Sequence, residues 1–114
     1  MKNIVEYLQQ KNIIFKSLKP IFPKELGTRK KIEIYLGINL KGYYGLVMCL
    51  SKKSRVLRKE TEEIIVLHQK IQNYIDAMIP YCYILIDAPL CSKAKTMLNE
   101  HGWKVFHREI GSRE

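Results

Sequence analysis

The chain has 114 residues, of which 46% are hydrophobic and 27% are charged, so it is long enough and apolar enough for one folded domain over residues 1–114. This composition excludes intrinsic disorder, and no apolar run approaches the roughly 20 residues of a membrane-spanning helix. The net charge of +9 at pH 7 favours polyanionic partners, with nucleic acid, DNA or RNA, ahead of an anionic membrane.

The positive charge belongs to the first half of the chain. Residues 1–59 hold 14 lysines and arginines against three acids, whereas residues 60–114 hold six against eight. Three cysteines, an odd number without a framework spacing, predict reduced thiols and a cytoplasmic location.

The first quarter of the chain predicts a short helix and a short strand. Apolar residues at helical spacing indicate an amphipathic helix over about 3–11, and residues 12–18 indicate a brief strand. Pro20 and Pro23 are expected to break regular structure, with a loop continuing over 27–31.

An antiparallel hairpin is predicted next. Apolar and polar residues alternate from Ile32 to Leu40, as in a strand with one buried face. Lys41-Gly42 suits a turn, and the continuous apolar run from Tyr43 to Leu50 indicates a strand buried on both faces.

The second half alternates helices and strands. A long helix is predicted over about 54–78, ended by Pro80, and is followed by a buried strand over 81–87. A helix over 92–101 and a last strand over 103–107 complete the chain. The order helix, strand, strand, strand, helix, strand, helix, strand predicts an α/β fold with a mixed sheet flanked by helices on both faces.

A cluster of cations lies where the hairpin should lead into the long helix. Five of the eight residues from 52 to 59 are basic: Lys52, Lys53, Arg55, Arg58 and Lys59. A helix start carries partial positive charge and normally attracts acids, so cations there suit a bound phosphate. A merely solvated first turn is the alternative interpretation.

Further residues extend this candidate nucleic-acid surface. Arg29, Lys30 and Lys31 precede the first hairpin strand, and Lys41 lies in its turn. The i,i+4 spacing of Arg58 with Glu62 and of Lys59 with Glu63 would neutralise part of the charge and leave Lys52, Lys53 and Arg55 free. Tyrosines interleave with these cations and could stack on bases, although cross-strand packing is their usual role: Tyr35, Tyr43 and Tyr44.

A strand that runs directly into a basic helix, within this order of elements, resembles the restriction-endonuclease-like superfamily with its PD-(D/E)XK motif. The resemblance implies a nuclease-like scaffold, in which acids and a lysine on the second and third strands hold a divalent metal and activate water. Carried onto this sequence, Lys53 matches the lysine of the motif and Ser51 occupies the place of an acid. Glu33 is the carboxylate on the preceding strand, and Glu6 could supply a further acid from the first helix.

The resemblance therefore implies Glu33 and Lys53 as catalytic residues and Glu33 with Glu6 as ligands of Mg²⁺. One or two carboxylates are the usual requirement for Mg²⁺, so the missing acid at Ser51 predicts a degenerate centre. The leading interpretation is a phosphate-backbone-binding protein on this scaffold. The first alternative is a metal-dependent DNA or RNA endonuclease, and a homodimer or an acidic protein partner also stays open.

The segment from Asp87 to Lys95 offers a second alternative. A buried strand, Pro89, Cys91 at a helix start and then Lys93 resemble the redox unit of glutaredoxins, which implies a thiol oxidoreductase that uses Cys91. A second cysteine at the expected spacing is missing, because Ala88 stands there. Asp87 is expected to cap the following helix, with a place beside Ser51 as the other option.

Overall fold

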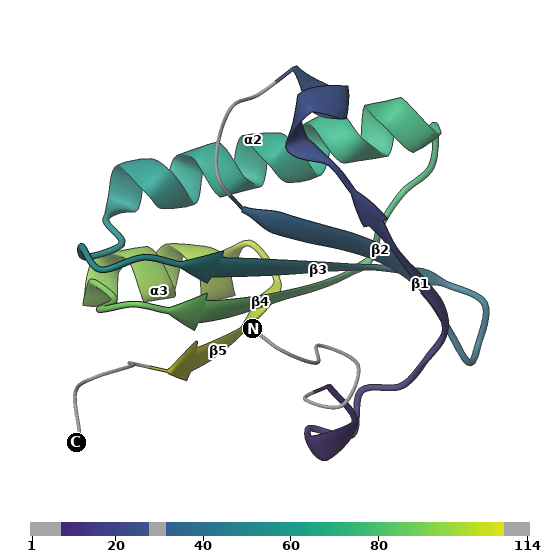
Figure 1. Ribbon diagram of the computed structural model, residues 1–114, viewed down its shortest axis with the longest axis horizontal. Coiled ribbons are helices and arrows are strands. Elements are labelled where there is room, and N and C mark those ends of the chain that lie inside the picture. Colours follow the sequence, from purple (N-terminus) through teal and green to yellow (C-terminus); the bar gives the residue numbers. More distant parts are fainter. Residues whose placement is uncertain (1–7, 28–31, 109–114) are drawn as a thin grey trace.

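The computed structural model describes residues 8–27 and 32–108 and forms a five-stranded mixed sheet with helices on it (Figure 1). The strands follow one another in space as they do in sequence, β1-β2-β3-β4-β5. The elements are β1 (Phe15–Ile21), a 3-10 turn η1 (Pro23–Leu26), β2 (Glu33–Asn39), β3 (Tyr44–Ser51), α2 (Arg58–Ile75), β4 (Tyr81–Asp87), α3 (Ser92–Glu100) and β5 (Trp103–Arg108). The predicted α/β class and the order of its described elements are confirmed.

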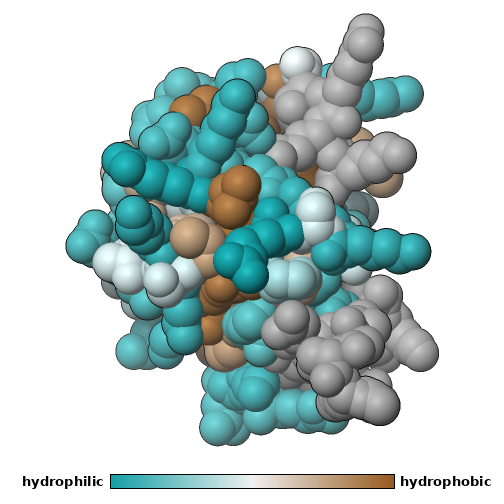
Figure 2. Space-filling model, turned by 90° about the vertical axis from the view of Figure 1, so that its left-hand side faces the viewer, coloured by the Kyte–Doolittle hydropathy of each residue, from teal (hydrophilic) through white to brown (hydrophobic). Residues whose placement is uncertain are grey.

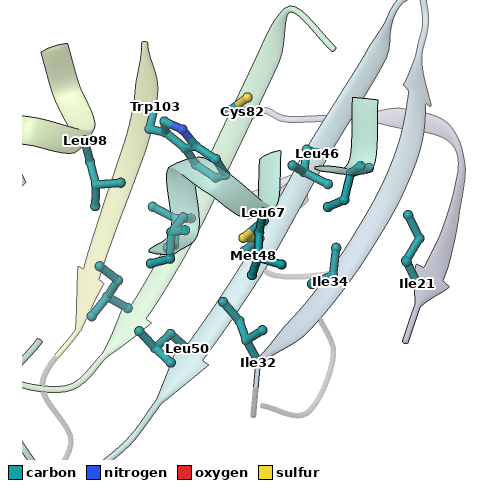
Figure 3. Close-up of a cluster of buried hydrophobic side chains, with 14 of the residues drawn as sticks. Ile21, Ile32, Ile34, Leu46, Met48, Leu50, Leu67, Cys82, Leu98 and Trp103 are labelled. Atoms are coloured by element: carbon teal, nitrogen blue, oxygen red, sulfur yellow. The ribbon is translucent and has the colours of Figure 1, made fainter. Parts of the chain in front are cut away.

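The sheet is antiparallel on one side and parallel on the other. β1, β2 and β3 pair antiparallel, whereas β3 with β4 and β4 with β5 pair parallel. Right-handed crossovers that step in one direction place their helices on the same face of a sheet. Leu67 of α2 and Leu98 of α3 accordingly share one core with Met48 of β3 and Cys82 of β4 (Figure 3). The predicted hairpin and the strand over 81–87 are confirmed.

The opposite face of the sheet is covered by the start of the described chain. Leu8, in a helical stretch over 8–10, packs with Val47, Cys49 and Leu85, and Ile13 lies against them. Most of the helix predicted over 3–11 falls outside the described residues. In the described part of the chain, no helix has the length and hydrophobicity needed to cross a membrane.

β1 begins and ends three residues later than predicted. The chain reverses at Asn12, which has a left-handed φ of 63°, so the strand starts only at Phe15. Pro20 does not break the strand but pairs with Tyr35. β1 lies at the edge of the sheet, where a residue without an N–H costs no ladder hydrogen bond on its open side.

α2 is shorter at both ends than the predicted 54–78. Val56 N–H donates to Pro89 O at 2.8 Å and Cys91 N–H donates to Val56 O at 3.1 Å, so residues near 56 are held extended. The helix therefore begins at Arg58. It ends before Asp76, which has a left-handed φ of 56°, and not at Pro80 as expected.

A pair of glycines lets the start of β1 pack closely against β2 and β3. Gly37 of β2 lies opposite Gly45 of β3, and the ring of Phe15 lies against both. A Cβ at Gly37 would lie 2.8 Å from the backbone oxygen of Ser17, whereas a Cβ at Gly45 would meet only the ring of Phe15. The close packing of Phe15 against β2 and β3 therefore depends on glycine at both positions.

Replacement of Gly37 by alanine should destabilise the fold more than the same change at Gly45. Gly37→Ala forces the β1 backbone to move, an overpacking cost of about 1–3 kcal/mol, whereas Gly45→Ala can be relieved by rotation of one ring. Urea unfolding followed by the emission of Trp103, the single tryptophan, measures both free energies. An unchanged urea midpoint of unfolding for Gly37→Ala would contradict this account of the packing between β1 and β2.

Candidate nucleic-acid interface

A polar hollow lies at the end of the sheet where β2 begins and β3 and β4 end. It has a volume of about 280 Å³ and combines apolar walls with four polar side chains, Glu33, Cys49, Ser51 and Asp87. Figure 2, which faces this end of the molecule, shows mostly hydrophilic residues around a central hydrophobic strip. We call this site the polar hollow.

Strand register explains why these four side chains meet. Glu33 lies opposite Cys49 in the β2–β3 pair, and Ser51 lies opposite Asp87 in the β3–β4 pair. Paired residues share a face of a sheet, and residues two apart on one strand do so as well. All four therefore belong to the face opposite α2 and α3, beyond Val47 and Leu85.

Two side chains that face each other in the hollow are the carboxylate of Glu33 and the thiol of Cys49. Glu33 Oε1 accepts a hydrogen bond of 3.1 Å from the hydroxyl of Tyr35, and burial together with this contact raises the pKa of Tyr35. Burial, and then the charge of Glu33, raises the pKa of Cys49 to about 12. Cys49 is therefore neutral at physiological pH and contributes no negative charge beside Glu33.

Asp87 is the hollow's second carboxylate, and the expectation that it caps α3 is wrong. The residue that precedes α3 in the N-cap position is Cys91, not Asp87. Asp87 is instead 7% exposed, and its backbone oxygen accepts a hydrogen bond from Lys52 N–H at 3.3 Å. A place for Asp87 beside Ser51 was the other option expected from the sequence, because both residues end buried strands.

Within the described residues, the hollow offers two carboxylates, those of Glu33 and Asp87, as potential ligands of a divalent metal. Mg²⁺ prefers carboxylate and other oxygen ligands, and the hollow presents two carboxylates beside a protonated thiol and a hydroxyl. No group of three or more His, Cys, Asp or Glu side chains able to hold a metal occurs in residues 8–27 and 32–108. Glu6, the other expected ligand, lies outside the described residues.

The cations predicted at the helix start lie mostly in a loop. Residues 52–59 form the connection from β3 into the first turn of α2, and we call them the cationic loop. Only Arg58 and Lys59 are helical, while Lys53 and Arg55 lie exposed before the helix. Val56 is fully buried and forms an isolated parallel bridge with Leu90, which fixes the loop beside the polar hollow.

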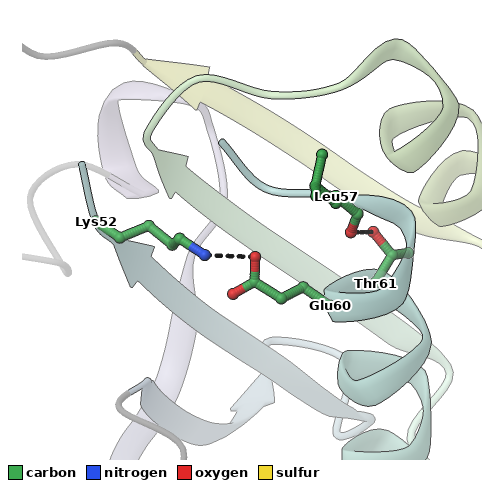
Figure 4. Close-up of polar contacts among 4 residues, drawn as sticks. All are labelled: Lys52, Leu57, Glu60 and Thr61. Atoms are coloured by element: carbon green, nitrogen blue, oxygen red, sulfur yellow. Dashed lines mark hydrogen bonds and ion pairs between the residues drawn. The ribbon is translucent and has the colours of Figure 1, made fainter. Parts of the chain in front are cut away.

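Lys52 is paired, contrary to the expectation that it would be free. Its ammonium group lies 2.5 Å from Glu60 Oε1, and both side chains are less than a third exposed (Figure 4). Glu60 also places an acid in the first turn of α2, where only cations were expected. The predicted pair of Arg58 with Glu62 is present at 3.6 Å on the exposed surface.

Lys53, the motif-matching lysine, lies beyond the end of β3 in the exposed part of the cationic loop. Lys41 is not brought near the loop, because the β2–β3 turn lies at the opposite end of the sheet (Figure 1). Three further predicted contacts lie outside the described residues: Arg29, Lys30 and Lys31.

Cys91 has part of the environment expected of a reactive thiol. It is partly exposed at the start of α3, and the backbone N–H groups of Ala94 and Lys93 lower its pKa, with a smaller contribution from Arg55. Cys49 and Cys82 are both buried, and none of the three cysteines forms a disulfide. Cys91 therefore has no partner cysteine for a dithiol reaction.

Comparison with known proteins identifies the fold. No model of a protein family matches the sequence, and neither does any curated protein. Among solved structures, EndoMS in its apo form superposes with a TM-score of 0.57 at 18% identity over 91% of this chain. The chain has a restriction-endonuclease-like fold.

Two more solved structures agree with this assignment. A repair endonuclease from Pyrococcus abyssi matches 91% of the chain with a TM-score of 0.53 at 14% identity. An EndoMS–dsDNA complex matches 95% with the same TM-score and identity. The chain spans 44% of the length of each of these neighbours.

Cys91 should be the first cysteine to react with iodoacetamide. Thiolate is the attacking species, so a lowered pKa gives Cys91 more thiolate at pH 7 than Cys82, whose pKa burial raises to about 12. We expect alkylation of Cys91 at least about ten times faster than that of either buried cysteine, measured by peptide mass spectrometry. Equal rates for all three in the folded protein would contradict the assigned environments.

Proposed function

We propose that this chain binds the phosphate backbone of nucleic acid through the cationic loop, on a nuclease-like scaffold whose catalytic centre is degenerate. The observation that carries the proposal is the fixed position of the loop, which the buried bridge between Val56 and Leu90 holds beside the polar hollow. Lysine and arginine contacts to phosphate supply sequence-independent affinity.

The exposed charges of the loop suit this role. Lys53 and Arg55 are exposed and precede the helix, where its unpaired N–H groups also favour an anion. Lys52 is already paired with Glu60, so its contribution to phosphate binding should be smaller. The support from the fold is that one neighbour of this architecture is an EndoMS–dsDNA complex.

The degenerate centre is proposed from the residues that face Glu33. The position directly opposite Glu33 holds the protonated thiol of Cys49, and Ser51 stands where the resemblance puts an acid. Neither side chain replaces a carboxylate as a ligand of Mg²⁺. Asp87 in the same hollow is the observation that favours the alternative, a metal-dependent endonuclease with Glu33 and Lys53 as catalytic residues.

The triple variant Lys52→Ala/Lys53→Ala/Arg55→Ala should lose most of its affinity for duplex DNA at low salt. Each phosphate contact contributes roughly 0.9 to the slope of log K against log salt, so the slope should fall by about two to three. Fluorescence anisotropy across a salt titration measures both quantities. Lys24→Ala/Lys70→Ala/Lys95→Ala, which removes the same charge at exposed positions outside the loop, is the control and should change the affinity far less.

Incubation of the protein with the same oligonucleotides and Mg²⁺ or Mn²⁺ distinguishes cleavage from binding alone. We expect no cut products on a denaturing gel. Cleavage that requires the metal and disappears in both Glu33→Ala and Asp87→Asn would establish the endonuclease alternative. The main proposal would be wrong if the protein bound neither duplex nor single-stranded oligonucleotides at low salt.

Glu60→Gln should raise the affinity for nucleic acid, opposite in direction to the triple variant. The change removes the carboxylate that pairs with Lys52, so the ammonium group becomes available to phosphate and a negative charge beside the loop disappears. Relief of one like-signed charge near a phosphate predicts a gain of about two- to fivefold at low salt. Glu62→Gln, which releases the exposed Arg58, is the matched control with a smaller expected gain.

A further inference from the structure

A second hollow lies at the other end of the same face of the sheet. It is an open groove of about 700 Å³ between the start of β4, the β2–β3 turn and residues 11–15. The residues that matter for its chemistry are Lys11, Lys41, Tyr81, Tyr83, Lys104 and Phe106. We call it the aromatic groove, and no acidic residue of the described chain lines it.

Aromatic rings form much of the groove's surface. Tyr81 is 39% exposed and lies 6.1 Å from Tyr43, which is 53% exposed, with the two rings tilted by 58°. Tyr83 lies deeper, in an edge contact of 6.1 Å with Phe15. Exposed aromatic faces next to packed ones provide a stacking surface that is held in place from below.

Three lysines line the groove together with these rings. The ammonium group of Lys11 lies 5.9 Å from the centre of the Phe106 ring, and Lys104 is the strand partner of Tyr83. Lys41 comes from the β2–β3 turn, beyond Tyr81. Three lysines among the lining residues, with no acid of the described chain among them, give the groove a positive field that favours a polyanion.

Hydrogen bonds hold two of the segments that line the groove, the β2–β3 turn and residues 11–15. Asn39 Oδ1 accepts from Lys41 N–H and from Tyr43 N–H, both at 2.9 Å. Ile13 N–H donates to Leu8 O at 2.8 Å, which closes the helical stretch before residues 11–15. The groove is therefore largely formed before a ligand arrives.

We propose that the aromatic groove binds single-stranded nucleic acid, with unpaired bases stacked on Tyr81 and its neighbours and phosphates near Lys11, Lys41 and Lys104. Aromatic platforms beside cations are the usual means of binding single strands, because every base has a face that stacks. A duplex hides its bases and would gain only the lysine contacts. The volume falls within the range of roughly 300–1,000 Å³ found for ligand sites.

This site is separate from the polar hollow and extends the proposed function to a second form of nucleic acid. The two lie at opposite ends of β4, whose seven residues span about 20 Å. The inference rests on the proposed function only in taking nucleic acid as the ligand class. Duplex binding by the cationic loop and single-strand binding by the groove can fail independently.

The test measures the affinity of groove variants for a fluorescein-labelled oligothymidylate of about eight nucleotides. Every variant also carries Lys52→Ala/Lys53→Ala/Arg55→Ala, so that the cationic loop does not contribute to binding. We expect Tyr81→Ala to weaken binding about tenfold, Tyr81→Phe to stay within about twofold, and Lys104→Ala to weaken it several-fold. Lys70→Ala, on the exposed side of α2, is the charge control and should bind as the background does. An unchanged Trp103 emission shows that each variant is folded.

An oligomer of the same length without bases separates stacking from charge. It should bind the background protein about tenfold more weakly than oligothymidylate does, with no further loss in Tyr81→Ala. Equal binding of the two oligomers, or an unchanged affinity in Tyr81→Ala and Lys104→Ala, would overturn the proposal. Tight binding of oligoglutamate that the same variants abolish would overturn it in favour of an acidic protein segment.

If the groove variants have no effect while duplex binding by the unmodified loop persists, only the groove inference fails. If duplex binding is absent while oligothymidylate binds in the groove, only the proposed function of the loop fails.

Discussion

The in-register parallel pairing of β3 with β4 is the constraint on which the rest of the molecule depends. The pairing runs from Gly45 opposite Tyr81 to Ser51 opposite Asp87 without a shift. At one end it brings two polar strand ends into one hollow, and at the other end it places Tyr81 beside the hairpin turn. A slip by one residue would turn both sets of side chains to the opposite face of the sheet, so this register defines both candidate sites.

The hydrophobic periodicity of the sequence predicted the strands whose boundaries are set by local sequence. The alternation of β2 and the apolar runs of β3 and β4 gave those strands to within a residue or two. The ends of α2 were wrong because tertiary contacts set them: the Val56 bridge to Leu90 holds the start extended, and a left-handed Asp76 ends the helix. Pro20 was misread because a proline inside a strand looks like a break until the strand is known to be an edge.

The sequence identified several single residues of the candidate site but few of the contacts between them. The resemblance to nucleases pointed to Glu33 and Ser51, and the ends of two buried strands offered a place for Asp87 beside Ser51. Cys49 was missed because its place opposite Glu33 depends on register. The pairing of Lys52 with Glu60 spans eight residues and exists only because the connection between them folds back. The aromatic groove collects side chains from segments up to 95 residues apart, Lys11 and Phe106, which no local pattern could reveal.

The composition of the polar hollow determines how strongly this edge of the sheet would repel a phosphate. Where several ionised carboxylates face a phosphate, their repulsion must be neutralised by a cation before the backbone can approach. Here the thiol of Cys49 stays protonated and Ser51 is neutral, so Glu33 and Asp87 are the ionisable acids that line the hollow. Lys53 and Arg55 lie exposed in the loop that follows it. The neutral thiol of Cys49 and the neutral hydroxyl of Ser51 repel a phosphate less than two carboxylates at these positions would.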